Sequence, residues 1–272
     1  MGFKDRPPGL PAYRRYWDQL RVARYLFASE QFEGGVVLDA GCGVGYGSDL
    51  LRDRADVVHG IDMSAREIEI ATNSYGRPGL DFKVGSITDT GFPSDHFDAI
   101  ACFEVIEHVE DQAGVLAEFG RILKPGGVLV CSTPNEEFTL GFDQHEEEFL
   151  PDTFFAFMRK GFQYVGEYAQ FITQADRDMD LARGDGSRGE FRRRVENAVL
   201  NRLFRLVPRG MERREAFDRW RKRDFYQPGD LFRRVASDLD PYYAVRALDG
   251  TEPKTKNDYL RFMIAVCSDA QR

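Results

Sequence analysis

The segment VLDAGCGVGYG, Val37 to Gly47, decides the fold of this 272-residue chain. An apolar, β-branched run leads into Asp39, and glycines then recur at Gly41, Gly43 and Gly45. Glycine permits a tight turn and lets a ligand approach the main chain closely. The segment therefore predicts a strand, a ligand-binding turn and the start of a helix, in that order.

Outward from this turn, strand-like and helical runs alternate. The strand-like runs are VVHGID, DFKVG, FDAIACF, VLVCST and FQYVGEYAQF, and YLRFMIAVCS follows near the end of the chain. Helical patterns cover Tyr46 to Arg54, Ala65 to Ser74 and Gln112 to Leu123, and the turn KPGG ends the last of them. Such alternation predicts right-handed βαβ units and an α/β fold with a doubly wound, mainly parallel sheet.

The same patterns divide the chain into four segments. Residues 1–35 are expected to form an N-terminal helical cap, and residues 36–173 the α/β core. Residues 174–256 are expected to form a helical insertion and linker, and residues 257–272 the final strand of the core. The insertion is rich in arginine, which is compatible with a solvated helix pair, with a contact in a homodimer, or with recognition of phosphate or carboxylate.

The overall composition excludes several classes of protein. A net charge of -8 argues against general affinity for nucleic acid. No apolar run is long enough to span a bilayer, and residues 1–11 lack the apolar core of a signal peptide, so no membrane partner and a cytoplasmic location are expected. The cysteines are scattered without a C-x-x-C pair, which predicts reduced packing thiols at Cys42, Cys102, Cys131 and Cys267.

Residues at the ends of the first strands predict a nucleoside cofactor. Asp39 is expected to face the cationic end of that cofactor, and Asp62, which ends VVHGID, to accept hydrogen bonds from ribose hydroxyls. Ser86 and Ile87 follow the third strand, where an adenine ring would lie. The spacing G-x-G-x-G differs from the G-x-G-x-x-G of dinucleotide binders and disfavours an NAD-dependent dehydrogenase. The full expected cofactor set is Asp39, Gly41, Gly43, Asp62, Met63, Ser86, Ile87 and Phe103.

From Val36 to Phe171 the chain resembles the class I S-adenosylmethionine (SAM)-dependent methyltransferases. The resemblance is closest to the group with ubiquinone-biosynthesis O-methyltransferases and sugar O-methyltransferases, and its motifs are VLDAGCGVGYGSDLL, GID, FDAIACFEVIEHV, RILKPGGVLVCSTPN and HEEEFLPDTF. It implies a seven-stranded, Rossmann-like sheet whose last strand is antiparallel, and SAM as cofactor. It also implies that Asp39, Gly41 and Gly43 lie near the methionine part. Ser86 departs from the aspartate that many relatives have there.

A second motif, FEVIEHV, suggests a metal site. Glu104, Glu107 and His108 have the i, i+3, i+4 spacing of one helical face, and His145 is expected in a loop at the same edge of the sheet. This pattern resembles that of metal-dependent family members, in which a divalent ion, usually magnesium, holds adjacent hydroxyls. By intrinsic affinity, a set of two histidines and two carboxylates would hold manganese, iron or zinc at least as well. Many relatives without a metal also carry an E-H pair here, as a hydrogen-bonded element of the fold.

The expected chemistry is methyl transfer to oxygen. This in-line displacement requires alignment of the acceptor and removal of its proton, for which His145 and His108 are the candidate catalytic residues. A metal would lower the pKa of a bound hydroxyl, and without a metal His145 is the expected base.

The expected acceptor is a hydroxyl of a sugar, oligosaccharide or polysaccharide. Aromatic residues in the expected acceptor region either stack on sugar faces or belong to the core: Phe138, Phe142, Phe149, Phe154, Phe155 and Tyr168. The alternatives are a catechol or quinone precursor, the 2'-hydroxyl at an RNA end, and a SAM-binding module without activity.

Overall fold

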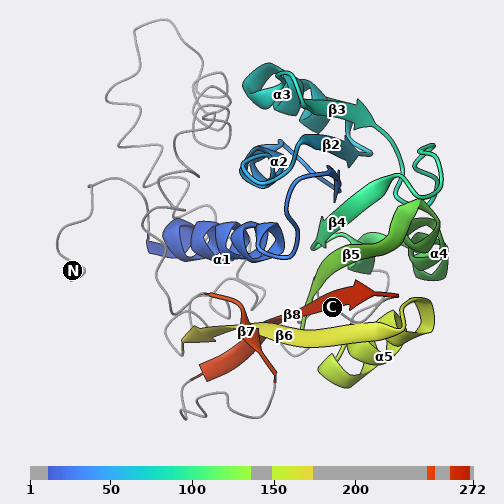
Figure 1. Cartoon of the computed structure of the whole chain (residues 1–272). Coiled ribbons are helices and arrows are strands. Elements are labelled where there is room, and N and C mark those ends of the chain that lie inside the picture. Colours follow the sequence, from blue (N-terminus) through green and yellow to red (C-terminus); the bar gives the residue numbers. More distant parts are fainter. Residues whose placement is uncertain (1–11, 136–148, 174–243, 249–257, 270–272) are drawn as a thin grey trace, which may run out of the picture.

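A mixed eight-stranded sheet forms the centre of the protein. The computed structural model describes residues 12–135, 149–173, 244–248 and 258–269 (Figure 1). The strand order is β3-β2-β1-β4-β5-β8-β6-β7. The strands are β1 (Val36–Ala40), β2 (Val57–Asp62), β3 (Leu80–Val84), β4 (Phe97–Phe103), β5 (Leu123–Pro134), β6 (Tyr164–Thr173), β7 (Arg246–Ala247) and β8 (Asp258–Ser268).

The first five strands run parallel, as expected from their alternation with helices. The C-terminal strand β8 lies between β5 and β6 and is antiparallel to both. This arrangement confirms the predicted antiparallel last strand. The sheet has one strand more than the predicted seven, because two residues of β7 pair with Tyr168 and Ala169 at the edge of β6.

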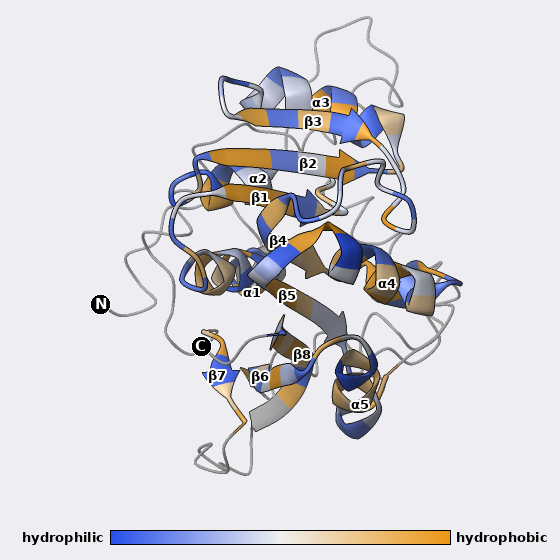
Figure 2. Ribbon diagram, turned by 45° about the vertical axis from the view of Figure 1, so that its right-hand side comes forward, coloured by the Kyte–Doolittle hydropathy of each residue, from blue (hydrophilic) through white to orange (hydrophobic). Residues whose placement is uncertain are grey.

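Helices cover both faces of the sheet. They are α1 (Ala12–Ser29), α2 (Tyr46–Leu51), α3 (Ala65–Tyr75), α4 (Gln112–Ile122) and α5 (Pro151–Gly161), with a short 3₁₀ turn, η1 (Ile106–His108). In Figure 1, α1, α2 and α3 lie on one side of the strands and α4 and α5 on the other. In Figure 2 the apolar colour follows the strands, whereas the outer helices also show hydrophilic positions.

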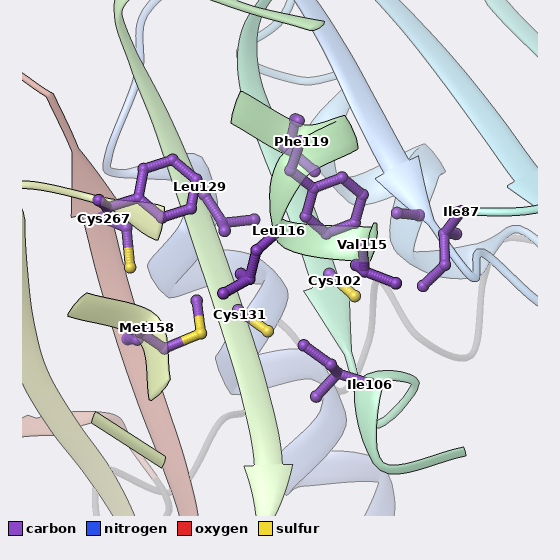
Figure 3. Close-up of a cluster of buried hydrophobic side chains, with 14 of the residues drawn as sticks. Ile87, Cys102, Ile106, Val115, Leu116, Phe119, Leu129, Cys131, Met158 and Cys267 are labelled. Atoms are coloured by element: carbon purple, nitrogen blue, oxygen red, sulfur yellow. The ribbon is translucent and has the colours of Figure 1, made fainter. Parts of the chain in front are cut away.

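Each face of the sheet has its own apolar core. Alternate residues of β1 divide between them, since Val37 packs with the α1–α2 side and Leu38 with the α4–α5 side. Figure 3 shows the second core, in which Phe119 and Met158 are fully buried. Burial of such a side chain contributes about 1.5 to 3 kcal/mol. The four cysteines are free and buried, as predicted.

The four-segment division is only partly within the described residues. Helix α1 occupies the predicted cap, and β8 occupies the predicted final strand. Of the predicted insertion, only residues 244–248 are described, and they contain β7. Among the helices in the described ranges, none is long and apolar enough to cross a membrane.

Candidate cofactor site

A cavity of about 560 Å³ opens beyond the carboxyl ends of β1, β2, β3 and β4. This is the edge at which open α/β sheets bind ligands, and the volume is within the range of small-molecule sites. Six of the eight predicted cofactor residues line it: Gly41, Asp62, Met63, Ser86, Ile87 and Phe103. Residues predicted at or just after the ends of four strands therefore line one cavity.

The glycine turn after β1 forms one wall of the cavity. Gly41 has φ +77°, and a Cβ there would lie 2.3 Å from Val105 Cγ2, so a larger residue is excluded on both grounds. The N–H groups of Gly41 and Cys42 both donate to the carbonyl of Ile61. Gly43 also has positive φ, but it lies outside the cavity lining. The turn thus brings the main chain of β1 against β2 beside the ligand space.

Asp62 is held rigidly at the end of β2. Its Oδ2 accepts from the Gly43 N–H at 3.0 Å, and its Oδ1 accepts from the Ser64 N–H at 2.8 Å. Each carboxylate oxygen keeps further acceptor capacity toward the cavity. This geometry is suited to paired hydroxyls, as the sequence predicted for ribose.

Removing this carboxylate is expected to weaken SAM binding by about 10- to 100-fold, because two charge-assisted hydrogen bonds to ribose would be lost. The measurement is the dissociation constant of SAM for Asp62→Ala by calorimetry. Asp89→Ala is the matched control, since Asp89 is exposed and outside the cavity lining. Unchanged affinity in Asp62→Ala would contradict the ribose assignment.

The turn after β3 forms the opposite wall. The Ser86 hydroxyl pairs with Thr88 Oγ1 at 2.8 Å and accepts from the Thr88 N–H at 3.2 Å. Ile87 is buried and faces the same space, while Met63 is 78% exposed at its rim. Thr88 also lines the cavity and was missed in the sequence, although its place just after a strand end is a usable signal.

The Ser86 hydroxyl is already engaged with Thr88, so Ser86→Ala is expected to raise the SAM dissociation constant by no more than about 5-fold. Equilibrium binding measured beside Ser94→Ala, at a serine outside the cavity lining, would test this. A loss as large as that expected for Asp62→Ala would show that Ser86 binds adenine directly.

Asp39 lies behind the glycine turn rather than in the cavity lining. It is fully buried and accepts hydrogen bonds from the Tyr25 hydroxyl at 3.1 Å and from the Ser48 hydroxyl at 2.6 Å. Burial raises the pKa of Asp39 to about 7, against the lowering effect of these two hydrogen bonds. The predicted role of Asp39 toward the methionine end of SAM stays a prediction.

Residues after β4 bring acidic and imidazole groups to the same cavity. Glu104 lines it with φ +60°, and its Oε1 accepts from the Ser132 hydroxyl at 2.7 Å. A non-glycine residue in this conformation is strained, a feature that clusters at functional sites. His108 also lines the cavity, and its side chain is 41% exposed. Both side chains therefore border the same cavity as the predicted cofactor residues.

Glu107 lies deeper than its two neighbours. Its side chain is 1% exposed and accepts from the Thr133 hydroxyl at 3.4 Å. Burial, with a contribution from Glu104, raises the pKa of Glu107 well above its usual value. The His108 Nε2 lies 4.0 Å from Glu107 Oε1, which is beyond hydrogen-bond distance.

The predicted helical face of Glu104, Glu107 and His108 was wrong. Glu104 precedes the three-residue 3₁₀ turn η1 and has a left-handed backbone, so the i, i+3, i+4 geometry of an α-helix does not apply. Within the described ranges, no three His, Cys, Asp or Glu side chains gather as a metal site would require. His145, the fourth predicted ligand, lies outside the described residues. The described donors therefore do not fit the predicted metal.

Of the aromatic residues that the sequence named for the acceptor region, those in the described ranges pack against other parts of the protein. Phe149, Phe154 and Phe155 are buried in the core beside α5, so they belong to packing. Tyr168 packs against Phe27 of α1, with ring centroids 4.9 Å apart. Phe138 and Phe142 lie outside the described residues.

A family model described as a methyltransferase domain matches residues 12–205, which is more than half of the chain. The chain belongs to this methyltransferase family. SAM-dependent methyltransferases among its relatives imply SAM as the cofactor, in agreement with the sequence resemblance.

Several curated proteins are similar to this methyltransferase. A "probable S-adenosylmethionine-dependent methyltransferase" of Mycolicibacterium smegmatis is 38% identical over 47% of this chain and 49% of its own length. A protein of Mycobacterium tuberculosis with the same description is 30% identical over 62% and 64%. A ubiquinone biosynthesis O-methyltransferase of Histophilus somni is 34% identical over 44% and 55%. The chain thus spans about half to two thirds of the length of these relatives.

Solved structures confirm the fold of the methyltransferase. The YcgJ protein of Bacillus subtilis matches with a TM-score of 0.51 at 14% identity, over 95% of this chain and all of that one. The [4+2]-cyclase SpnF matches with a TM-score of 0.51 at 15% identity, over 93% and 82%. Because a cyclase shares the fold, the fold alone does not determine the reaction.

Proposed function

We propose that this methyltransferase transfers the methyl group of SAM to a hydroxyl group of a small acceptor. One observation carries the proposal: six predicted cofactor residues line the same cavity as Glu104 and His108. Cofactor contacts and groups able to bind or deprotonate an acceptor are therefore adjacent. The mycobacterial and ubiquinone-biosynthesis relatives support methyl transfer as the reaction.

The reaction requires few groups from the protein. A lone pair of the acceptor oxygen forms the new C–O bond while the methyl–sulfur bond breaks, and its electrons remain on sulfur. The products are a methyl ether, S-adenosylhomocysteine and a proton. Because the sulfonium is already activated, the protein must mainly align the two reactants and accept that proton.

His108 is the described residue best placed to accept the proton. It faces the cavity, and an exposed imidazole can reach an acceptor directly or through one water. Glu104 can orient the acceptor hydroxyl by accepting a hydrogen bond from it. His145 remains the other candidate base from the sequence. No step is assigned to a metal, since within the described ranges no three His, Cys, Asp or Glu side chains gather as a metal site requires.

The acceptor class has two candidates. The sequence favoured a sugar or oligosaccharide, but three of the aromatic residues that were either sugar-stacking or core candidates belong to the core. The ubiquinone-biosynthesis relatives favour a catechol or quinone precursor. Both classes present a hydroxyl next to another oxygen, so one assay can compare them.

The test is incubation of the protein with methyl-labelled SAM and a panel of sugars, oligosaccharides, catechols and short RNAs. Parallel arms contain EDTA or added magnesium or manganese. Label in a methyl ether that persists in EDTA would support the metal-free mechanism. Transfer only with added metal would restore the predicted metal site. Binding of SAM without transfer to any acceptor would contradict the proposed O-methylation and favour a binding module.

A further inference from the structure

Tyr25 of helix α1 contacts the end of the glycine turn. A Cβ on Gly47 would lie 1.9 Å from Tyr25 Cζ, so the ring occupies the space that this glycine leaves open. The same ring packs edge-on against Phe103, with centroids 4.9 Å apart, and against Tyr46 at 5.5 Å. Phe103 lines the cavity, so Tyr25 packs between the start of α2 and a residue of the cavity wall.

The Tyr25 hydroxyl reaches through this contact to Asp39. It donates to Asp39 Oδ1 at 3.1 Å, and the Ser48 hydroxyl of α2 donates to Oδ2 at 2.6 Å. Asp39 is fully buried and lies two residues before Gly41, which lines the cavity. A buried carboxylate persists in its ionised form only when donors of this kind hold it.

We propose that Tyr25 is a positioning residue for the cofactor: its hydroxyl orients the Asp39 carboxyl group behind the glycine turn, and thereby couples docking of α1 to SAM binding. The inference rests on the proposed binding of SAM in the adjacent cavity. SAM is cationic at its sulfonium and at its ammonium group, so a carboxylate behind the turn attracts it. By linkage, bound SAM strengthens the attachment of α1 as much as docked α1 strengthens SAM binding.

The charged and titratable groups around Asp39 determine how its pKa is shifted, and therefore how SAM affinity and stability depend on pH. Burial raises its pKa, hydrogen bonds from Ser48 and Tyr25 lower it, and the neighbouring Asp62 raises it further. Tyr46 and Cys42 also face Asp39, and both are themselves held neutral by burial, which raises their pKa values. Cys102 of β4 also interacts with Asp39, and its pKa is raised by its contact with Cys131 and by burial.

Because the pKa of Asp39 in the free protein is about 7, a bound cation favours the ionised form and releases a proton. SAM affinity is therefore expected to rise as pH increases through about 7. In the absence of SAM, the effect of rising pH on the stability of the native state has the opposite sign. The pKa of Asp39 is raised above its unfolded value, so the protonated form stabilises the native state at low pH and this contribution is lost as pH rises through about 7.

The test is SAM binding by calorimetry to the full chain and to Tyr25→Phe, from about pH 6 to about pH 9. Loss of the hydroxyl removes a donor to the carboxylate, so the pKa of Asp39 rises. The variant is expected to bind SAM about 10-fold more weakly near pH 7, with its affinity midpoint displaced to higher pH. Ser48→Ala should shift the midpoint in the same direction. Tyr164→Phe, at an exposed tyrosine of β6, is the matched control and should leave the profile unchanged.

Hydrogen exchange gives a second readout of the coupling. SAM is expected to slow exchange of the α1 amides in the unaltered protein and to slow it less in Tyr25→Phe. A loss of affinity that is equal at every pH would overturn the inference and leave Tyr25 a packing residue. Failure of the unaltered chain to bind SAM at any pH would instead overturn the proposed function on which the inference rests.

Discussion

Gly41→Ala is expected to abolish detectable SAM binding and to destabilise the protein by about 2 to 4 kcal/mol. The Cβ would lie 2.3 Å from Val105 Cγ2, and alanine would be forced to φ +77°. To relieve either problem the turn must move, and the turn is a wall of the cavity. Thermal unfolding with and without SAM measures both effects.

Gly120→Ala is the matched control for this substitution. Gly120 is in α4, and a Cβ there meets no atom within 4 Å. Alanine should stabilise the helix at this position by about 0.5 to 1 kcal/mol. The double variant Gly41→Ala, Val105→Ala removes the clash but retains the strained φ, so a partial recovery of stability is expected. Normal SAM binding by Gly41→Ala alone would show that the turn does not contact the cofactor.

His108→Asn is expected to lower kcat for methyl transfer by about 100- to 10,000-fold, the usual contribution of a general base. Its SAM dissociation constant should remain within about 3-fold of the original, since the imidazole acts on the acceptor rather than on the cofactor. The measurements are single-turnover transfer to the best acceptor of the panel and equilibrium binding of SAM.

His96→Asn is the control for loss of an imidazole. His96 precedes β4 at the opposite edge of the sheet and stacks on Phe92, with ring centroids 5.8 Å apart. This variant should retain full transfer. If His108→Asn also retained it, the proton would have to be accepted elsewhere, and His145→Asn would be the next variant to measure.

Much of the cofactor site could be predicted because it depends on local backbone chemistry. Gly41 and Asp62 follow β1 and β2 directly, and parallel strands place their carboxyl ends at one edge. Residues at four strand ends could therefore be assigned to one cavity without knowledge of how the layers pack. The same reasoning extends to Thr88, which follows β3 and was overlooked.

The surroundings of Asp39 could not be predicted in this way. Its spacing from the glycines suggested direct contact with the cofactor, but its partners come from α1 and α2. Nothing in the local sequence indicates that Tyr25 would reach it, because their contact depends on how α1 packs over Gly47. The burial that raises the pKa of Asp39 is likewise a property of the assembled layers.

The antiparallel last strand was predicted through the family resemblance alone. The sequence by itself determined the α/β class and the position of the candidate cofactor cavity. These follow from hydrophobic periodicity, turn chemistry and the fixed geometry of parallel strands, which act over a few residues. Only the tertiary structure showed that the chain leaves β4 through Glu104, which has a strained backbone, and then forms the 3₁₀ turn that contains Glu107 and His108. The Glu104 and Glu107 side chains accept hydrogen bonds from Ser132 and Thr133 of the neighbouring strand, and such contacts between distant segments have no local signature.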